Sequence, residues 1–274
     1  MRKRFAILAA TAAAALALSG CAASDGEEVS NPGGEAELVI GASPVPHAQI
    51  LEYVRDNLAE DEGLKITIKE FDDYVLPNQT LNDGELDANY FQHLPYLESE
   101  MKEKGYEFEH GEGVHIEPLR LFSSKVKSPD EIKDGATIAI TNDVSNQARG
   151  LLLLQEAGLL KDITTESSVL ELTAEQNPKN LQFEETQPEV VVQLIDDPKI
   201  DAALVNANFV FSAGLNPEEA ILSESVDGSP YANVLVWKKG NDDPNVKKLE
   251  ELLHSQEVKD YIKETWPNGD VVAG

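Results

Sequence analysis

The chain has 274 residues, of which 22 are lysine or arginine and 50 are aspartate or glutamate, so its formal net charge at pH 7 is −28. A field of that sign repels nucleic acids and anionic membrane surfaces, and the composition therefore excludes polyanion binding as a function. The single cysteine, Cys21, excludes an internal disulfide, so the fold must depend on its hydrophobic core.

The first twenty residues have the features of a secretory signal peptide. Arg2, Lys3 and Arg4 form a cationic start, and an apolar, alanine-rich run follows over residues 5–18. That run is too short to cross a hydrocarbon layer of about 30 Å, which needs about 20 residues. We therefore expect residues 1–20 to be a signal peptide, and its removal would leave a net charge of −31, because three basic residues are lost.

The end of this run, Leu18-Ser19-Gly20-Cys21, resembles a bacterial lipobox, in which the cysteine sulfur receives a diacylglycerol and cleavage occurs just before it. Two or more acyl chains, palmitate for example, give stable membrane attachment. Residues 21–36 are small, polar and acidic, without aromatic side chains, which predicts a flexible tether. We expect a lipoprotein, anchored through Cys21 on the extracytoplasmic face of the cell membrane.

The remaining residues alternate between strand and helix patterns, which favours an α/β fold with a largely parallel sheet. Short apolar or alternating runs predict strands at residues 37–41, 65–71, 86–90, 137–141, 200–205 and 232–237. Helical spacing of apolar residues predicts helices at 47–60, 94–104 and 146–159, and two short helices within 245–263.

Polar segments follow three of the predicted strands, at residues 43–47, 142–146 and 206–208. In open α/β sheets, ligands bind at the carboxyl ends of the strands. These segments are therefore the first places to expect a binding site.

Several segments, in the same order along the chain, are similar to the methionine-binding lipoproteins of the MetQ/NlpA family. They are residues 73–78 (DYVLPN), 87–97 (DANYFQHLPYL), 141–149 (TNDVSNQAR), 177–181 (NPKNL), 201–206 (DAALVN) and 229–233 (SPYAN). The resemblance covers nearly the whole chain after the tether.

The resemblance implies a two-lobed periplasmic-binding-protein (Venus flytrap) fold with two crossover strands. Lobe 1 would comprise residues 37–117 and 234–274, and lobe 2 residues 118–233. The implied function is capture of methionine, as the L or D enantiomer or both, outside the cell and its delivery to the permease of an ABC transporter. We expect a monomer without a cofactor, and no enzymatic activity.

A free amino acid presents a carboxylate and an ammonium, and buried charges left unpaired are costly. Arg149 is the natural partner of the carboxylate, because a guanidinium fork can hold both oxygens and because backbone N–H groups near a helix start also favour anions. The resemblance favours Asn146 and Asn206 as further ligand contacts. The alternatives are a solvated helix face for Arg149, helix capping for Asn146 and a turn for Asn206. We also expect Arg149→Ala to abolish binding with little change in melting temperature.

The side chain of methionine would meet an aromatic wall. Tyr74, Phe91, His93 and Tyr96 could line it, since sulfur near ring edges gains about 0.3–1.5 kcal/mol per contact. Ordinary core packing of these rings remains the alternative. His47, at a predicted helix start, is a candidate contact at the rim of the site.

Rival functions find less support in the sequence. The chain has no Gly-x-Ser-x-Gly elbow, Walker loop or Gly-x-Gly-x-x-Gly motif, although a chance Ser/His/Asp set stays open. Its five histidines lack ligand spacing, and His110 with His115, in an expected loop, is the one conceivable metal pair, so no metal is expected. A surface adhesin or scaffold lipoprotein and a receptor for a methionine-containing dipeptide or another amphipathic amino acid remain as alternatives.

Overall fold

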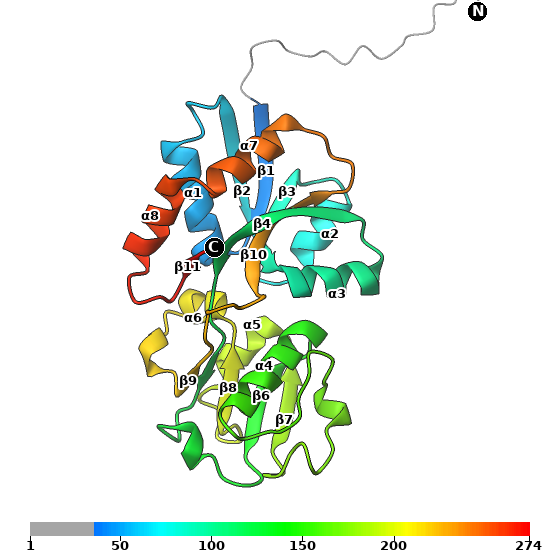
Figure 1. Cartoon of the computed structure of the whole chain (residues 1–274), viewed down its shortest axis with the longest axis vertical. Helices are drawn as coiled ribbons and strands as arrows, with labels where there is room; N and C mark the ends of the chain where they lie inside the picture. The colour runs from blue at the N-terminus through cyan, green and yellow to red at the C-terminus, as the bar shows by residue number, and fades with distance from the viewer. Residues whose placement is uncertain (1–35) are drawn as a thin grey trace, which may run out of the picture. The chain divides into compact units, whose positions relative to one another are not determined.

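The computed structural model describes residues 36–274, so the predicted signal peptide, Cys21 and the expected tether up to residue 35 lie outside the described residues. The described chain forms two β-sheets with helices between their strands (Figure 1). The larger sheet has the order β11-β4-β10-β3-β1-β2. Its strands are β1 (Ala36–Ala42), β2 (Leu64–Glu70), β3 (Ala88–His93), β4 (Phe108–Ile116), β10 (Ala232–Lys238) and β11 (Val272–Ala273).

The smaller sheet has the order β7-β6-β8-β5-β9. Its strands are β5 (Arg120–Phe122), β6 (Thr137–Thr141), β7 (Gln182–Thr186), β8 (Ala202–Val205) and β9 (Leu222–Ser223). In both sheets the strands that alternate with helices pair in parallel, as β1 does with β2 and β3 and as β6 does with β7 and β8. The strands next to the connections between the sheets, β10 and β5, pair antiparallel.

The helices divide between the two sheets. Those of the larger sheet are η1 (Pro44–Ala48), α1 (Gln49–Asn57), α2 (Leu76–Asn82), α3 (Leu94–Lys104), α7 (Pro244–Leu253) and α8 (Gln256–Thr265). Those of the smaller sheet are α4 (Val144–Glu156), α5 (Pro188–Val191) and α6 (Ala207–Ser212), with short 3₁₀ turns at Pro129–Glu131, Val169–Glu171, Val192–Leu194 and Pro217–Glu219. We call the larger sheet with its helices the first lobe and the smaller sheet with its helices the second lobe.

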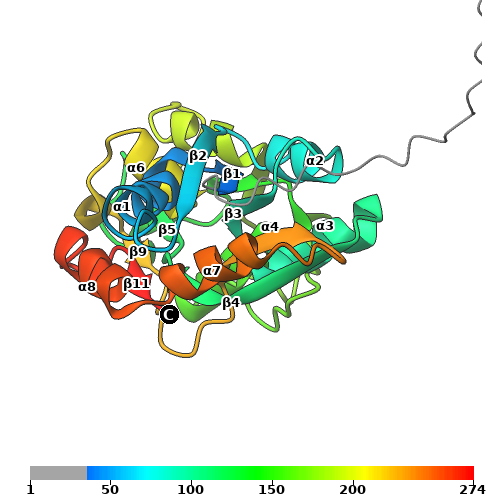
Figure 2. The ribbon, with the colours of Figure 1, turned by 90° about the horizontal axis from the view of Figure 1, so that it is seen from above.

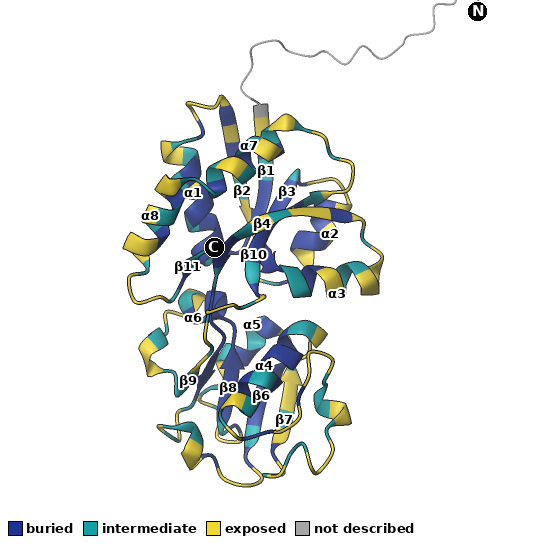
Figure 3. Ribbon diagram, viewed as in Figure 1, coloured by how far each residue is buried: buried dark blue, intermediate teal, exposed yellow. Residues whose placement is uncertain are grey.

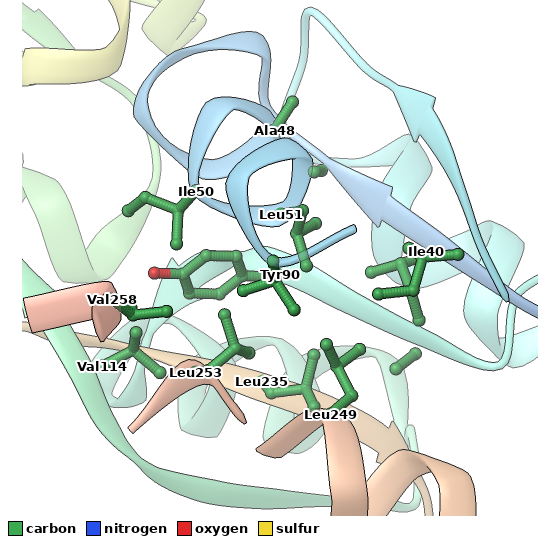
Figure 4. Packing of buried hydrophobic residues seen from close by; sticks show 14 of the residues in the cluster. Ile40, Ala48, Ile50, Leu51, Tyr90, Val114, Leu235, Leu249, Leu253 and Val258 are labelled. Carbon is green, nitrogen blue, oxygen red and sulfur yellow. The ribbon is translucent and has the colours of Figure 1, made fainter. Parts of the chain in front are cut away.

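The core of the first lobe lies between its sheet and the helices α1, α7 and α8. Apolar residues on the strands, such as Ile40 and Leu235, contact Leu51 of α1 and Leu249 of α7 in one buried cluster (Figure 4). α1 and α8 lie side by side in both views of the ribbon (Figures 1 and 2), with the rings of Tyr53 and Tyr261 stacked 4.3 Å apart. A second cluster with α2 and α3 covers the other face, so the sheet is buried on both sides.

This packing predicts a large loss of stability for Leu249→Ala. The Leu249 side chain is completely buried, and its truncation leaves a cavity in a close-packed cluster. We expect the free energy of unfolding to fall by about 2–5 kcal/mol. Urea denaturation measures the change, and Lys247→Ala on the exposed face of α7 is the control, for which we expect less than about 0.5 kcal/mol.

The second lobe has the same layered construction. Ile138 and Ile140 of β6 contact Leu151 and Leu154 of α4 on one face, while α5 and α6 cover the other. β6 and β8 are buried, whereas β7 at the edge of the sheet is largely exposed (Figure 3). The run of four leucines that makes α4 strongly apolar is thus explained by burial against β6 and β8.

Two connections join the sheets. The first is residues 117–119, between β4 and β5, and the second is residues 224–231, between β9 and β10. The C-terminal segment crosses beside the first connection: β11 pairs with β4, and the Asp270 carboxylate accepts a hydrogen bond of 2.6 Å from the Arg120 guanidinium on β5. Both charged groups are largely buried, so the C-terminal segment is bound to both lobes.

The predicted α/β fold with two lobes and two crossings is confirmed. The expected helix at 94–104 and strand at 137–141 agree with α3 and β6. The expectation that His110 and His115 lie in a loop is wrong, because both are on β4, whose polar and glycine residues hide its strand pattern. Between residues 36 and 274, no helix combines the length and apolar character needed to cross a membrane.

Candidate functional site

One cavity is lined by all seven predicted ligand-binding residues. They are Tyr74, Phe91, His93, Tyr96, Asn146, Arg149 and Asn206, and each is at most 9% exposed. Five further residues that were not named as ligand contacts complete the lining: Gln92, Glu117, Ala207, Asn208 and Asn233. Ala207 and Asn208 belong to the polar segment 206–208 in which a site was expected. The first lobe supplies the aromatic residues, and the starts of α4 and α6 in the second lobe supply most of the polar ones.

Arg149 lies in the second turn of α4 and is 4% exposed. Its Nε donates to both carboxylate oxygens of Glu224 at 3.0 and 3.1 Å, and its Nη2 donates to Glu224 Oε2 at 2.5 Å and to the backbone oxygen of Glu117 at 2.7 Å. The ring of Tyr231 lies 4.2 Å from the guanidinium carbon. A solvated position for Arg149 is therefore ruled out.

These contacts change the expectation for the guanidinium fork. The Nε edge is occupied by Glu224, so within the described residues only Nη1 makes no hydrogen bond. A ligand carboxylate would meet that remaining end. Removing Arg149 would also strip Glu224 of its partner, so we no longer expect an unchanged melting temperature for Arg149→Ala.

Asn146 connects the two lobes through its side-chain oxygen. Asn146 Oδ1 accepts hydrogen bonds from Asn206 Nδ2 at 2.9 Å and from His93 Nε2 at 3.0 Å. The capping role weighed for Asn146 belongs instead to Asp143, whose carboxylate accepts from the Asn146 backbone N–H at 2.8 Å. His93 Nδ1 accepts from the Tyr96 backbone N–H, so the ring is neutral, with its proton on Nε2. Burial and, next, the nearby Arg149 lower the pKa of His93 to about 3.

The aromatic residues form one wall. The ring of Tyr74 lies 5.9 Å from Phe91, 5.6 Å from Tyr96 and 5.1 Å from Phe209 of the second lobe, measured between centroids. The Tyr74 hydroxyl donates to Asn208 Oδ1 at 2.6 Å, and the Tyr96 hydroxyl donates to the Tyr74 backbone oxygen at 3.0 Å. The polar ends of the rings are thus satisfied, and their faces and edges are left as an apolar surface.

Glu117 is the main residue that sequence reasoning missed. It follows β4 in the first connection and is 7% exposed. Its Oε1 lies 3.3 Å from His47 Nε2 and 3.0 Å from His115 Nε2. Burial raises the pKa of Glu117, while His47, Arg149 and Arg120 oppose that rise. A lone carboxylate between Ile116 and Pro118 was the one local signal for it.

The expectation for His47 is corrected. His47 is 1% exposed and lies behind Glu117, and its ring packs against Tyr90 and His115 at centroid distances of 5.0 and 4.9 Å. It is therefore not a contact at the rim of the site. Burial lowers the pKa of His47 to about 4 and that of His115 to about 3. Both rings are therefore neutral near pH 7.

Two chemical properties of the site follow. Among the lining residues, Arg149 is the basic side chain and Glu117 the acidic one, a pair that matches a zwitterion with an apolar side chain directed to the aromatic wall. His47, His115 and Glu117 also have the donor types of a metal site, with ligand atoms within 4.8 Å of one another. In this arrangement His115 Nε2 already donates a hydrogen bond to the carboxylate, and His47 Nε2 donates to Asn233 Oδ1 while lying 3.3 Å from Glu117 Oε1.

Comparison with known proteins gives a consistent result. Residues 38–274 match the family described as NlpA lipoprotein. The chain is 38% identical to the methionine-binding lipoprotein MetQ of Bacillus subtilis (strain 168), with 91% of each chain covered. A lipoprotein structure from Actinomyces odontolyticus is similar at a TM-score of 0.82 and 45% identity, covering 88% of this chain and 99% of the other. A nutrient binding protein from Burkholderia cenocepacia, solved bound to methionine, is similar at a TM-score of 0.80 and 38% identity, covering 86% and 99%. On this evidence, the chain belongs to the NlpA lipoprotein family.

Proposed function

We propose that this chain is an extracytoplasmic solute-binding lipoprotein that captures methionine and delivers it to an ABC transporter. The observation that carries the proposal is the cavity lining, which combines one buried cation, one buried anion and an aromatic wall. The relatives support it, since they include methionine-binding lipoproteins and a structure solved with methionine bound.

In the proposed complex, each part of the ligand has a partner of matching chemistry. The carboxylate accepts from Arg149 Nη1 and from the amide of Asn206, next to Asn146. The ammonium donates to Glu117, which gives the buried carboxylate a counter-charge. The thioether packs among Tyr74, Phe91 and the neighbouring rings, where sulfur–aromatic contacts are worth about 0.3–1.5 kcal/mol each.

We propose that binding is coupled to closure of the two lobes. We assign residues 37–117 and 234–274 to lobe 1 and residues 118–233 to lobe 2. The membership of the two sheets supports this division except at Ala232 and Asn233, which begin β10 of the larger sheet. Because both lobes contribute to the cavity, a ligand that contacts both favours the closed form by its differential affinity. The closed form is then the state that the permease would recognise.

The proposal also covers where the protein works and in what form. We propose a monomer, anchored through a lipid on Cys21 at the extracytoplasmic face of the cell membrane, with no catalytic activity. A Cys21→Ala protein should then be recovered in the soluble fraction. Persistent association with membranes would contradict the anchor.

Calorimetry on the purified protein, refolded to remove carried-over ligand, tests the function. We expect one mole of methionine bound per mole of protein with a dissociation constant of about 1 μM or below, since the ligand's charges and its side chain are all buried. Titrations with L-methionine, D-methionine and glycyl-methionine use the same protein sample. Millimolar binding of both enantiomers together with tight binding of the dipeptide would favour the dipeptide receptor instead.

A further inference from the structure

Glu117 belongs to a buried row of five polar side chains: Tyr90, His115, Glu117, His47 and Asn233. Of these, Glu117 and Asn233 line the cavity, and the other three lie behind it. The Tyr90 hydroxyl hydrogen-bonds to His115 Nδ1, His115 Nε2 to Glu117 Oε1, and His47 Nε2 contacts both Glu117 Oε1 at 3.3 Å and Asn233 Oδ1 at 3.1 Å. Tyr90 and His115 are fully buried. Figure 4 shows the Tyr90 ring packed beside Ile50 and Val258, with its hydroxyl directed away from Ile40.

The direction of each hydrogen bond follows from the partners. The Glu117 carboxylate can only accept, so His115 Nε2 carries the single proton of that neutral ring and donates it to Glu117, which leaves Nδ1 to accept from the Tyr90 hydroxyl. His47 Nε2 faces only oxygen acceptors and therefore also carries its proton. The His115 N–H is thus donated to Oε1, while the His47 N–H is donated to Asn233 Oδ1 and lies 3.3 Å from Oε1. The two neutral rings fix the position of the carboxylate, and the hydrogen bond from His115 favours its ionised form.

Neutral donors have a specific advantage here. They orient the carboxylate without cancelling its charge, so the negative charge of Glu117 remains available to a cation in the cavity. Both histidine contacts are made to Oε1, so neither ring occupies Oε2, and Glu117 itself lines the cavity. A protonated histidine at either position would instead compete with a ligand ammonium for the same carboxylate.

We propose that His47 and His115, supported by Tyr90, are positioning residues that make the site specific for ligands with a free α-ammonium. The inference rests on the proposed function, since it concerns how the same cavity reads an amino acid. It assigns to these two rings the discrimination between an α-amino acid and the corresponding acid without the amino group.

The test compares methionine with 4-(methylthio)butanoate, which has the same carboxylate and thioether but no ammonium. For the wild-type protein we expect calorimetry to show methionine favoured by about 100-fold or more, because the analogue leaves Glu117 buried and unpaired. His115→Met and His47→Met should each weaken methionine binding by about 10- to 100-fold and change binding of the analogue by less than about 3-fold. Glu117→Gln removes the carboxylate itself and should show the largest effect, with the preference for methionine over the analogue largely lost.

A conservative substitution separates positioning from folding. His115→Gln and His47→Gln keep an N–H donor near the position of Nε2 and should restore most of the preference for methionine. If His115→Met and His47→Met lose affinity equally for both ligands, or leave the preference for methionine unchanged, the inference is overturned and the proposed function stays intact. Wild-type protein that binds no methionine at all would overturn the proposed function and this inference with it.

The same variants test whether His47, His115 and Glu117 bind a metal ion. Zn²⁺ is titrated into ligand-free protein in a buffer that does not chelate it. We expect no binding that depends on His115. Stoichiometric binding of Zn²⁺ that is lost in His115→Met and competes with methionine would identify the triad as a metal site and overturn the positioning role.

Discussion

Replacing Arg149 by methionine should strongly weaken methionine binding and also destabilise the protein. The ligand loses its only cationic partner among the lining residues, which we expect to weaken binding by about 2–5 kcal/mol, or about 30- to several thousand-fold. Glu224, whose side chain is 12% exposed, loses the guanidinium that holds both its oxygens. A buried ion pair that loses one partner leaves an uncompensated charge, which costs about 3–5 kcal/mol of folding free energy.

A second substitution separates these two effects. In the double variant Arg149→Met with Glu224→Gln, the stranded charge is gone, so most of the folding free energy should return while methionine binding stays lost. Urea denaturation and calorimetry on the two single variants and the double variant complete the cycle. Recovery of binding in the double variant, or normal binding by Arg149→Met, would refute the role of the guanidinium in ligand recognition.

Mild acid should unfold the ligand-free protein over a narrow pH range. His47, His93 and His115 are buried and neutral, with pKa values of about 4, 3 and 3, whereas unfolded histidine titrates near 6.5. Between these values the unfolded chain binds more protons, so the stability present above about pH 6.5 is lost as pH falls. In this range each histidine lowers the free energy of unfolding by about 1.4 kcal/mol for every pH unit of acidification. The three together lower it by about 4 kcal/mol per pH unit.

Two buried carboxyl groups act in the opposite sense. Burial raises the pKa of Glu117 and of Asp143, so both take up protons more readily in the folded state and offset part of the loss at the acid end. The steepest fall is therefore expected between about pH 6 and 5, measured by urea denaturation at half-unit steps. His93→Gln should reduce the slope by about one third, and His110→Gln on the exposed part of β4 controls for the loss of a histidine. A flat profile down to pH 5 would mean that these rings are not held neutral.

Much of the fold could be predicted because its signals are local. The TIAIT run of β6 is buried on both faces and has no polar residue in its middle, and α3 ends at a glycine with positive φ directly after its last predicted residue. β4 could not be recognised, because Gly111, Glu112 and Gly113 break its alternation. Its strand conformation is imposed by pairing with β10 and β11 on its two sides.

The site could be predicted only in part, for a related reason. Arg149, Asn146 and Asn206 follow strands along the chain, so the alternation of strand and helix places them at one edge of a sheet. Glu117 depends on His47, seventy positions earlier, and Arg149 depends on Glu224, seventy-five positions later. Such pairs form by tertiary folding, and a single sequence contains no local pattern from which they can be derived.

The C-terminal segment has a mechanical consequence for the hinge. β11 is hydrogen-bonded to β4, while Asp270, two residues before it, is paired with Arg120 on the far side of the first connection. A rotation that separates the sheets about residues 117–119 must therefore either stretch this ion pair or bend the chain between Asp270 and β11. The amplitude of opening is limited by how far that short stretch can extend before a buried charge enters water.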